Sequence, residues 1–272
     1  MADAKGPDMS TLVQVRDEFC CYTTSDFNHQ GLTQAHFTYE EIFELRTYLR
    51  HGVRLAPDAV VLDVGANIGL FSLFVKQECP SARVLAFEPM PAVVEALRRN
   101  LDLHGVPDVE VHALALGARR EEAVFTYHPA LSCNSTNRPE GKELLLEMQR
   151  VLFGEHAAGS EEVRVDVDTL SAVLERRSDL DRIDLLKIDV EGAELDVLRG
   201  VGAANWPRVD QVVVEVHDRD GRLADVLALL GAQGFRTSSQ ASSLLTESAD
   251  LREAGAEDVP PGDYLVYATR PR

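Results

Sequence analysis

Basic residues are scarce in this sequence of 272 residues. Lys and Arg together number 27, against 45 Asp and Glu, so the formal net charge is −18. Binding to nucleic acid or to an anionic membrane surface depends on clustered Lys and Arg. The composition therefore argues against nucleic-acid and membrane partners. It leaves a small neutral or cationic substrate open.

Cysteine is also rare, and long apolar runs are missing. Cys20, Cys21, Cys79 and Cys133 form no Cys-x-x-Cys motif, and the adjacent pair is poorly placed to bridge itself. No apolar run reaches the length of a transmembrane helix, and the first residues lack an apolar signal core. We therefore expect reduced thiols and a cytoplasmic location.

The most informative stretch that is present is Val60–Leu73. It begins with an apolar, β-branched run that only Asp63 interrupts, which is typical of a strand buried on both faces of a parallel sheet. Gly65 and Gly69 predict a tight turn whose backbone can approach a ligand closely, and helical spacing begins at Ile68. Strand, glycine turn and helix in this order favour a nucleotide-cofactor cradle, although many α/β folds also turn on glycine.

A second expected strand, Arg83–Phe87, ends at Glu88 and Pro89. Glu88 follows Gly69 by 19 positions. An acidic residue at about this distance, at the carboxyl end of a strand, can accept hydrogen bonds from ribose hydroxyls. The pattern therefore predicts a ligand that contains a nucleoside.

The glycine spacing favours a nucleoside without a diphosphate. Counted from Gly65, a dinucleotide fingerprint needs glycines where Asn67 and Leu70 stand. S-adenosylmethionine carries no phosphate, and its ammonium and carboxylate need polar groups and free N–H donors instead. We expect Asp63 to help place the ammonium and the turn up to Gly69 to face the methionine end, which favours S-adenosylmethionine over NAD.

The remaining pattern alternates strands and helices, as in a doubly wound α/β sheet. The expected strands are Val109–Ala113, Ile183–Asp189 and Gln211–His217, followed by a terminal pair at Phe235–Ser238 and Tyr264–Ala268; the expected helices are Pro91–His104 and Leu223–Leu230. Because the third strand ends near the expected adenine position, Ala113–Ala115 are candidates for backbone contacts.

Residues 1–56 precede this core. Thr38 and Glu41 form a capping-box pattern, so we expect a helix over Tyr39–His51 that serves as a lid or platform. Upstream, Thr11–Thr23 is either a strand pair or an irregular start.

The core, residues 57–272, contains an insertion at 117–169 after the third strand. Strands are expected at Ala123–His128 and Glu161–Val167, with a helix at Glu140–Phe153 between them. Long insertions are often functional, so we expect this one to form part of the substrate pocket. Its polar loop offers hydrogen-bonding candidates, namely Ser132, Asn134, Ser135 and Thr136.

The carboxyl ends of the later strands carry the candidate catalytic groups. Asp189 and Glu191 follow one strand, and Glu215 and His217 lie on one face of the next. His217, with an ordinary pKa near ~6.5, suits a general base, whereas Asp189, near ~3.9, is a weak base unless desolvated and is placed to orient the acceptor or the ammonium. Alternatively, Asp189, Glu215 and His217 hold a divalent ion that lowers the pKa of the acceptor, or His217 is structural.

Taken together, these motifs resemble the FkbM-type methyltransferase family. The resemblance is carried by Tyr39–Phe43, Asp63–Gly69, Phe87–Pro89, Leu186–Glu194 and Glu215–His217. It implies a class I methyltransferase (Rossmann-like) sheet that is parallel except for one antiparallel strand, with S-adenosylmethionine as cofactor. It also implies O-methylation of a hydroxyl on a small molecule, frequently a secondary metabolite.

We therefore expect a methyltransferase that works as a monomer or homodimer on a small-molecule acceptor. The expected cofactor-binding residues are Tyr39, Asp63, Gly65, Ala66, Asn67, Gly69, Glu88, Pro89, Ala115 and Asp189. N-methylation, a nicotinamide-dependent oxidoreductase and a non-catalytic cofactor-binding protein remain the alternatives.

Overall fold

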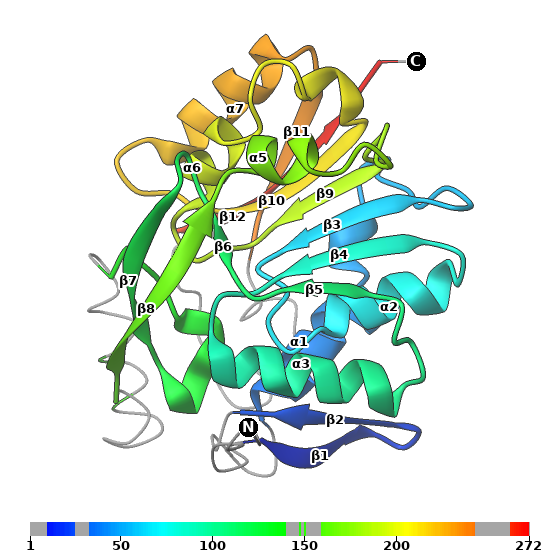
Figure 1. Cartoon of the computed structure of the whole chain (residues 1–272), viewed down its shortest axis with the longest axis vertical. Coiled ribbons are helices and arrows are strands. Elements are labelled where there is room, and N and C mark those ends of the chain that lie inside the picture. Colours follow the sequence, from blue (N-terminus) through cyan, green and yellow to red (C-terminus); the bar gives the residue numbers. More distant parts are fainter. Residues whose placement is uncertain are drawn as a thin grey trace.

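A seven-stranded sheet forms the centre of the protein (Figure 1). The structure is a computed structural model that describes residues 10–24, 33–139, 147, 150, 159–242 and 262–271, so the helix expected over Glu140–Phe153 lies almost wholly outside the described residues. The strand order is β11-β12-β10-β9-β3-β4-β5. The strands are β3 (Val60–Val64), β4 (Arg83–Phe87), β5 (Glu110–His112), β9 (Leu185–Ile188), β10 (Gln211–His217), β11 (Arg236–Ala241) and β12 (Asp263–Thr269).

The pairing confirms the expected fold class. Strand β12 is antiparallel to both of its neighbours, and the other pairs are parallel. The order reverses between β3 and β9, since the chain first builds outward from β3 through β4 to β5 and then returns. Open α/β sheets bind ligands at such a switch point, beyond the carboxyl ends of the strands.

Helices cover both faces of this sheet (Figure 1). One face carries α2 (Leu70–Glu78) and α3 (Pro91–Leu103), and the other carries α5 (Leu170–Glu175), α6 (Glu194–Arg199) and α7 (Arg222–Ala232). Because side chains alternate along a strand, neighbouring strand residues join different cores. Val61 packs in the cluster with α2, and Leu62 packs in the cluster on the opposite face.

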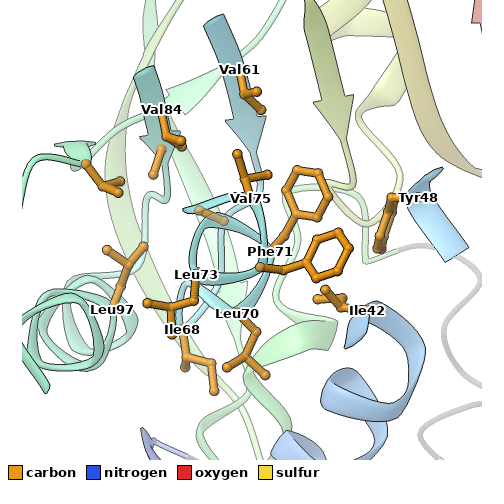
Figure 2. Packing of buried hydrophobic residues seen from close by; sticks show 14 of the residues in the cluster. Ile42, Tyr48, Val61, Ile68, Leu70, Phe71, Leu73, Val75, Val84 and Leu97 are labelled. Atoms are coloured by element: carbon orange, nitrogen blue, oxygen red, sulfur yellow. The ribbon is translucent and has the colours of Figure 1, made fainter. Parts of the chain in front are cut away.

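The core around α2 connects the sheet to the N-terminal region. Figure 2 shows Phe71 and Val75 of α2 between Val61 of the sheet and two residues of the N-terminal region, Ile42 and Tyr48. All five side chains are nearly inaccessible to solvent. The N-terminal region is thus packed onto the core rather than held apart from it.

The N-terminal helix differs from the one expected over Tyr39–His51. The chain forms a hairpin of β1 (Thr11–Arg16) and β2 (Phe19–Thr23), then α1 (Gln34–Tyr39), a π-helical turn at Glu40–Glu44 and a 3-10 turn at Thr47–Leu49. The helix begins after Thr33, whose backbone N–H donates to His36 Nδ1 at 3.1 Å. It ends before Arg46, which has φ +50° and pairs with Glu78 at 2.6 Å. The capping box expected at Thr38 is therefore wrong.

Two strands of the insertion and the short strand just before it form a separate three-stranded sheet, with the order β6-β8-β7. Its strands are β6 (Ala115–Leu116), β7 (Glu121–Tyr127) and β8 (Glu161–Asp168), and a 3-10 segment, η3 (Pro129–Asn134), follows β7. Strands β7 and β8 pair antiparallel along their whole length. Both strands expected within the insertion are confirmed.

Within the described ranges, the helices are too short or too polar for any of them to cross a lipid bilayer.

Candidate active site

A pocket opens beyond the carboxyl ends of β3, β4 and β9. It contains about 1060 Å³ of space between the atoms, part of which is open to solvent. The expected site residues that line it are Gly65, Asn67, Glu88, Pro89, Ala115, Asp189 and Glu191. The insertion contributes a further wall, which includes Ser132, Cys133, Ser135, Asn137 and Arg138.

Glu88 is held in this pocket by two backbone amides. The N–H of Asn67 donates to Oε2 at 3.0 Å and the N–H of Met90 donates to Oε1 at 2.9 Å. Burial raises the pKa of Glu88 to about 7, although the two amide bonds oppose this rise. Each carboxylate oxygen has two acceptor sites, so each retains the capacity to accept one more hydrogen bond. This is the arrangement expected for a carboxylate that receives the two hydroxyls of a ribose.

Asn67 presents an unsatisfied acceptor to the same pocket. Its φ is +49°, a left-handed conformation that Asn tolerates better than most residues. Its Oδ1 atom is buried and has no hydrogen-bond partner among the described residues. Buried polar atoms are normally satisfied, so this oxygen needs a donor from a ligand or water.

At both glycines of the turn, the space that a side chain would need is occupied by other parts of the chain. A Cβ atom at Gly65 would lie 1.7 Å from the carbonyl oxygen of Asp189, and one at Gly69 would lie 3.1 Å from Leu97. Gly65 also lines the pocket, but Gly69 does not. Ala66 is likewise outside the lining, and its N–H donates to Phe87 O at 3.0 Å. Direct ligand contact by Gly69 and Ala66 is therefore not supported.

Asp63 lies behind the pocket, not in its wall. Its side chain is fully buried, Ser72 Oγ donates to Oδ2 at 2.7 Å, and Lys187 Nζ lies 3.2 Å from Oδ1. Lys187 also donates to Gly65 O at 2.7 Å. The structure does not support the expectation that Asp63 receives the methionine ammonium, because the carboxylate is outside the pocket lining and pairs with a buried lysine. The pair fixes the turn from behind.

Asp189 faces the pocket at the end of β9. Tyr48 Oη donates to Oδ2 at 3.1 Å, and Lys187 Nζ lies 3.7 Å from the same oxygen. Burial raises the pKa of Asp189, and the Lys187 ammonium opposes the rise. A carboxylate with a raised pKa is a better proton acceptor than an ordinary aspartate.

His217 lies outside the pocket lining and is clamped between two carboxylates. Nε2 is 3.1 Å from Glu191 Oε2, and Nδ1 is 3.1 Å from Glu194 Oε1. Burial lowers the pKa of His217, but the two carboxylates outweigh this effect and raise the pKa well above the ordinary value. Because His217 lies outside the pocket lining and both ring nitrogens face carboxylates, the structure does not support the expected general-base role.

The structure does not bring together the ligands expected for a metal centre. Both ring nitrogens of His217 are engaged by carboxylates. Glu215 Oε1 accepts a hydrogen bond from Ser242 at 2.9 Å and does not line the pocket. In the part of the chain that the structure describes, no group of three or more His, Cys, Asp or Glu side chains is arranged to hold an ion.

Tyr39 lies elsewhere. Its ring stacks on Phe43 with centroids 4.5 Å apart and contacts Phe19 of the hairpin. It does not line the pocket, so the expected cofactor contact is not supported. In the insertion, Ser132 and Ser135 reach the pocket as expected, whereas Asn134 and Thr136 do not.

Comparison with known proteins agrees with this geometry. A family model described as "Methyltransferase FkbM domain" matches residues 63–237. The chain belongs to the FkbM methyltransferase family. The match includes the β3 turn, Glu88, Asp189 and the clamp on His217.

Named relatives of this FkbM-family chain are methyltransferases. The 31-O-demethyl-FK506 methyltransferase FkbM of Streptomyces tacrolimicus is 42% identical over 220 residues, which cover 76% of this chain and 84% of the relative. Methyltransferase 1 of Beauveria bassiana is 36% identical over 228 residues, or 82% of this chain and 88% of the relative. Methyltransferase sdnD of Sordaria araneosa is 40% identical over 215 residues, or 74% and 82%. The chain is thus a methyltransferase, as expected from its motifs.

Three site features of this FkbM-family protein have no local sequence signal. Tyr48 reaches Asp189 from 141 positions away, and Lys187 lies beneath the turn. Asn137 lines the pocket with a buried Oδ1 that has no hydrogen-bond partner within the described part of the chain.

Proposed function

We propose that this FkbM-family methyltransferase uses S-adenosylmethionine to methylate a hydroxyl oxygen of a small molecule. The observation that carries the proposal is the Glu88 carboxylate, which two backbone amides hold at the pocket. The position of Glu88 at the end of β4 suits a ribose, and the order of the sheet suits a nucleoside ligand at β3.

The residues present fit the cofactor in chemistry as well as in position. Glu88 would accept from the ribose hydroxyls, and the unsatisfied Asn67 Oδ1 would accept from a further donor of the ligand. The carboxylates Asp189 and Glu191 make the β9 end of the pocket suitable for the cationic part of the molecule. When bound, the cofactor supplies an electrophilic methyl group on a sulfonium.

Asp189 is the residue that we assign to the acceptor's proton. A hydroxyl must lose its proton as its oxygen becomes methylated, so a proton acceptor at the pocket is needed. Asp189 lines the pocket and has a raised pKa, and Tyr48 fixes its orientation. Of the four candidate catalytic residues, Asp189 and Glu191 line the pocket, whereas Glu215 and His217 lie outside its lining.

The insertion and the relatives support a small organic molecule as the methyl acceptor. Ser132, Ser135 and Asn137 bring polar groups to the pocket, and Phe125 and Leu116 bring apolar ones. This mixture fits an oxygen-bearing organic molecule. One relative is named for methylation at an oxygen of FK506. The net charge of −18 argues against a nucleic-acid acceptor.

Two measurements test the proposal. Calorimetric titration of the whole chain should show binding of S-adenosylhomocysteine and none of NADH. Incubation with methyl-labelled S-adenosylmethionine and matched panels of hydroxylated and amino acceptors should label the hydroxylated compounds. NADH binding without S-adenosylhomocysteine binding would overturn the cofactor assignment. Labelling confined to amines would replace O-methylation by N-methylation.

A further inference from the structure

Glu191 has an unusual backbone for a residue in the wall of the pocket. Its φ is +55°, in the left-handed region that residues other than glycine rarely adopt. Such a conformation has an energetic cost, and it persists only when neighbouring contacts enforce it. Two contacts do so here. Thr136 Oγ1 donates to the backbone oxygen of Glu191 at 2.6 Å, and His217 Nε2 lies 3.1 Å from Oε2.

His217 is itself fixed from behind. Its Nδ1 lies 3.1 Å from Oε1 of Glu194, a residue with no solvent exposure, and Arg222 Nη1 donates to the His217 backbone oxygen at 2.7 Å. Glu194 Oε1 also accepts from the Gly192 N–H at 2.5 Å. The imidazole therefore connects a rigid buried carboxylate to the carboxylate at the pocket, while remaining outside the pocket lining itself.

The charges around the ring leave this end of the pocket negative. The carboxylates that face or neighbour His217 are Glu191 and Glu194, Asp263 of β12 at 3.9 Å, and Glu215 on its own strand. The cations are His217 and Arg222 of α7. Burial raises the pKa of Glu215 well above its ordinary value, so the balance is three acidic groups against two basic groups. This balance favours a cationic ligand group nearby.

The strand order places this negative end opposite the ribose site. Strand β3 lies between β4, which carries Glu88, and β9, which leads to Glu191. A ligand with its ribose at Glu88 that extends across β3 brings its other end toward Glu191. Of the two other acidic candidates, Asp63 lies behind the pocket against Lys187, and Asp189 is the residue assigned above to the acceptor's proton.

We propose that the Glu191 carboxylate binds the ammonium of the cofactor's amino-acid end and that His217 is a positioning residue that holds Glu191 in place. This inference rests on the proposed function, because it takes S-adenosylmethionine as the ligand. It assigns His217 a role in binding rather than in proton transfer.

The test compares two ligands that differ only at this end. S-adenosylhomocysteine has the amino-acid group, whereas 5′-methylthioadenosine keeps the adenosine and the sulfur and lacks it. Calorimetry on the full chain should show that Glu191→Gln weakens S-adenosylhomocysteine binding at least about tenfold and leaves methylthioadenosine binding unchanged. His217→Gln should cause a smaller loss with the same ligand selectivity, and it should add nothing in the Glu191→Gln background.

Glu122→Gln is the matched control, since Glu122 is an exposed residue of β7 outside the pocket lining, paired with Arg164. It should leave both affinities unchanged. The Glu191→Gln arm decides the inference even where His217→Gln lowers the melting temperature, because Glu191 is part of the wall and not of the core.

Equal losses for both ligands, or unchanged S-adenosylhomocysteine affinity in Glu191→Gln, would overturn the inference. Absence of S-adenosylhomocysteine binding in the unaltered protein would instead overturn the proposed function. The two failures are thus distinguishable in the same series of titrations.

Discussion

Gly65 and Asp189 meet through their backbones where β3 and β9 end. A Cβ atom at Gly65 would lie 1.7 Å from the Asp189 carbonyl oxygen, and φ at Gly65 is +77°. Both residues line the pocket. The turn after β3 can therefore lie this close to Asp189, the proposed proton acceptor, only because residue 65 has no side chain.

Gly65→Ala should destabilise the protein by about 2–5 kcal/mol. The left-handed backbone disfavours alanine by about 1–2 kcal/mol, and displacement of packed backbone adds a further ~1–3 kcal/mol. Urea denaturation measures the loss. Gly221→Ala is the control, because Gly221 has φ +80° and nothing within 4 Å of an added Cβ. Equal losses at the two positions would show that close packing against Asp189 contributes nothing.

Glu88→Ala should weaken S-adenosylhomocysteine binding by ~1–3 kcal/mol, through the loss of hydrogen bonds to the ribose. Glu88→Gln should lose less, since the amide keeps one acceptor oxygen. Calorimetry measures both, and the pair separates hydrogen bonding from simple loss of volume. Full affinity in Glu88→Ala would remove Glu88 from the cofactor site.

The affinity for S-adenosylhomocysteine should rise as the pH is increased through about 7. Burial raises the pKa of Glu88 to about 7, so the ligand-free carboxyl is partly protonated near neutrality. The ionised form accepts more hydrogen bonds, so ligand binding favours proton release and strengthens toward higher pH. Glu88→Gln should lack this component of the pH profile. A wild-type profile that matches the variant would contradict the assignment.

Lys187→Met should destabilise the fold by about 3–5 kcal/mol, because it leaves the buried Asp63 carboxylate without its cation. The loss should grow as the pH rises. Burial raises the pKa of Asp189 and the Lys187 ammonium opposes this rise. Without the ammonium, the ionised form of Asp189 costs more in the folded than in the unfolded state, and this cost increases as the pH rises. Chemical denaturation at several pH values measures this slope.

Lys76→Met is the control for Lys187→Met. Lys76 is also buried, but its carboxylate partner, Asp108, is 65% exposed and can be hydrated. The loss of stability in Lys76→Met should therefore be smaller than in Lys187→Met and less dependent on pH. Adding Asp63→Asn to Lys187→Met should recover part of the stability, and strict additivity of the two changes would contradict the coupling.

The sequence predicted the sheet well because its signal is local. The strands Val60–Val64, Arg83–Phe87 and Gln211–His217 have the bounds that their apolar runs predicted. A strand buried on both faces must be apolar along its length, so its ends are visible in the sequence. The glycine turn and Glu88 followed from spacing relative to these strands.

The N-terminal helix could not be predicted in the same way. The pattern at Thr38 and Glu41 satisfies a capping rule, but the structure begins the helix at Thr33 with the imidazole of His36 in the role of the acidic residue. The left-handed Arg46 is stabilised by an ion pair with Glu78, 32 positions away. Tertiary contacts decided both ends.

The roles of individual charged residues depended on partners that spacing does not reveal. Asp63 and His217 lie at the expected places in their strands. The roles expected from the sequence are not supported, because Lys187 lies beside Asp63 and because Glu191 and Glu194 enclose His217. A sequence motif places a side chain at the edge of a sheet, but only the fold determines which atom meets it there.

The hydroxyl of Thr136 bonds the insertion to the backbone of Glu191. Residues that shape the acceptor wall are thus physically joined to the strand that delivers the carboxylates. Residues 117–169 therefore cannot be exchanged between relatives, in search of new acceptors, without affecting the backbone of Glu191. Chimeras need a hydroxyl-bearing residue at the position of Thr136, or the donor segment disturbs the cofactor side together with the acceptor side.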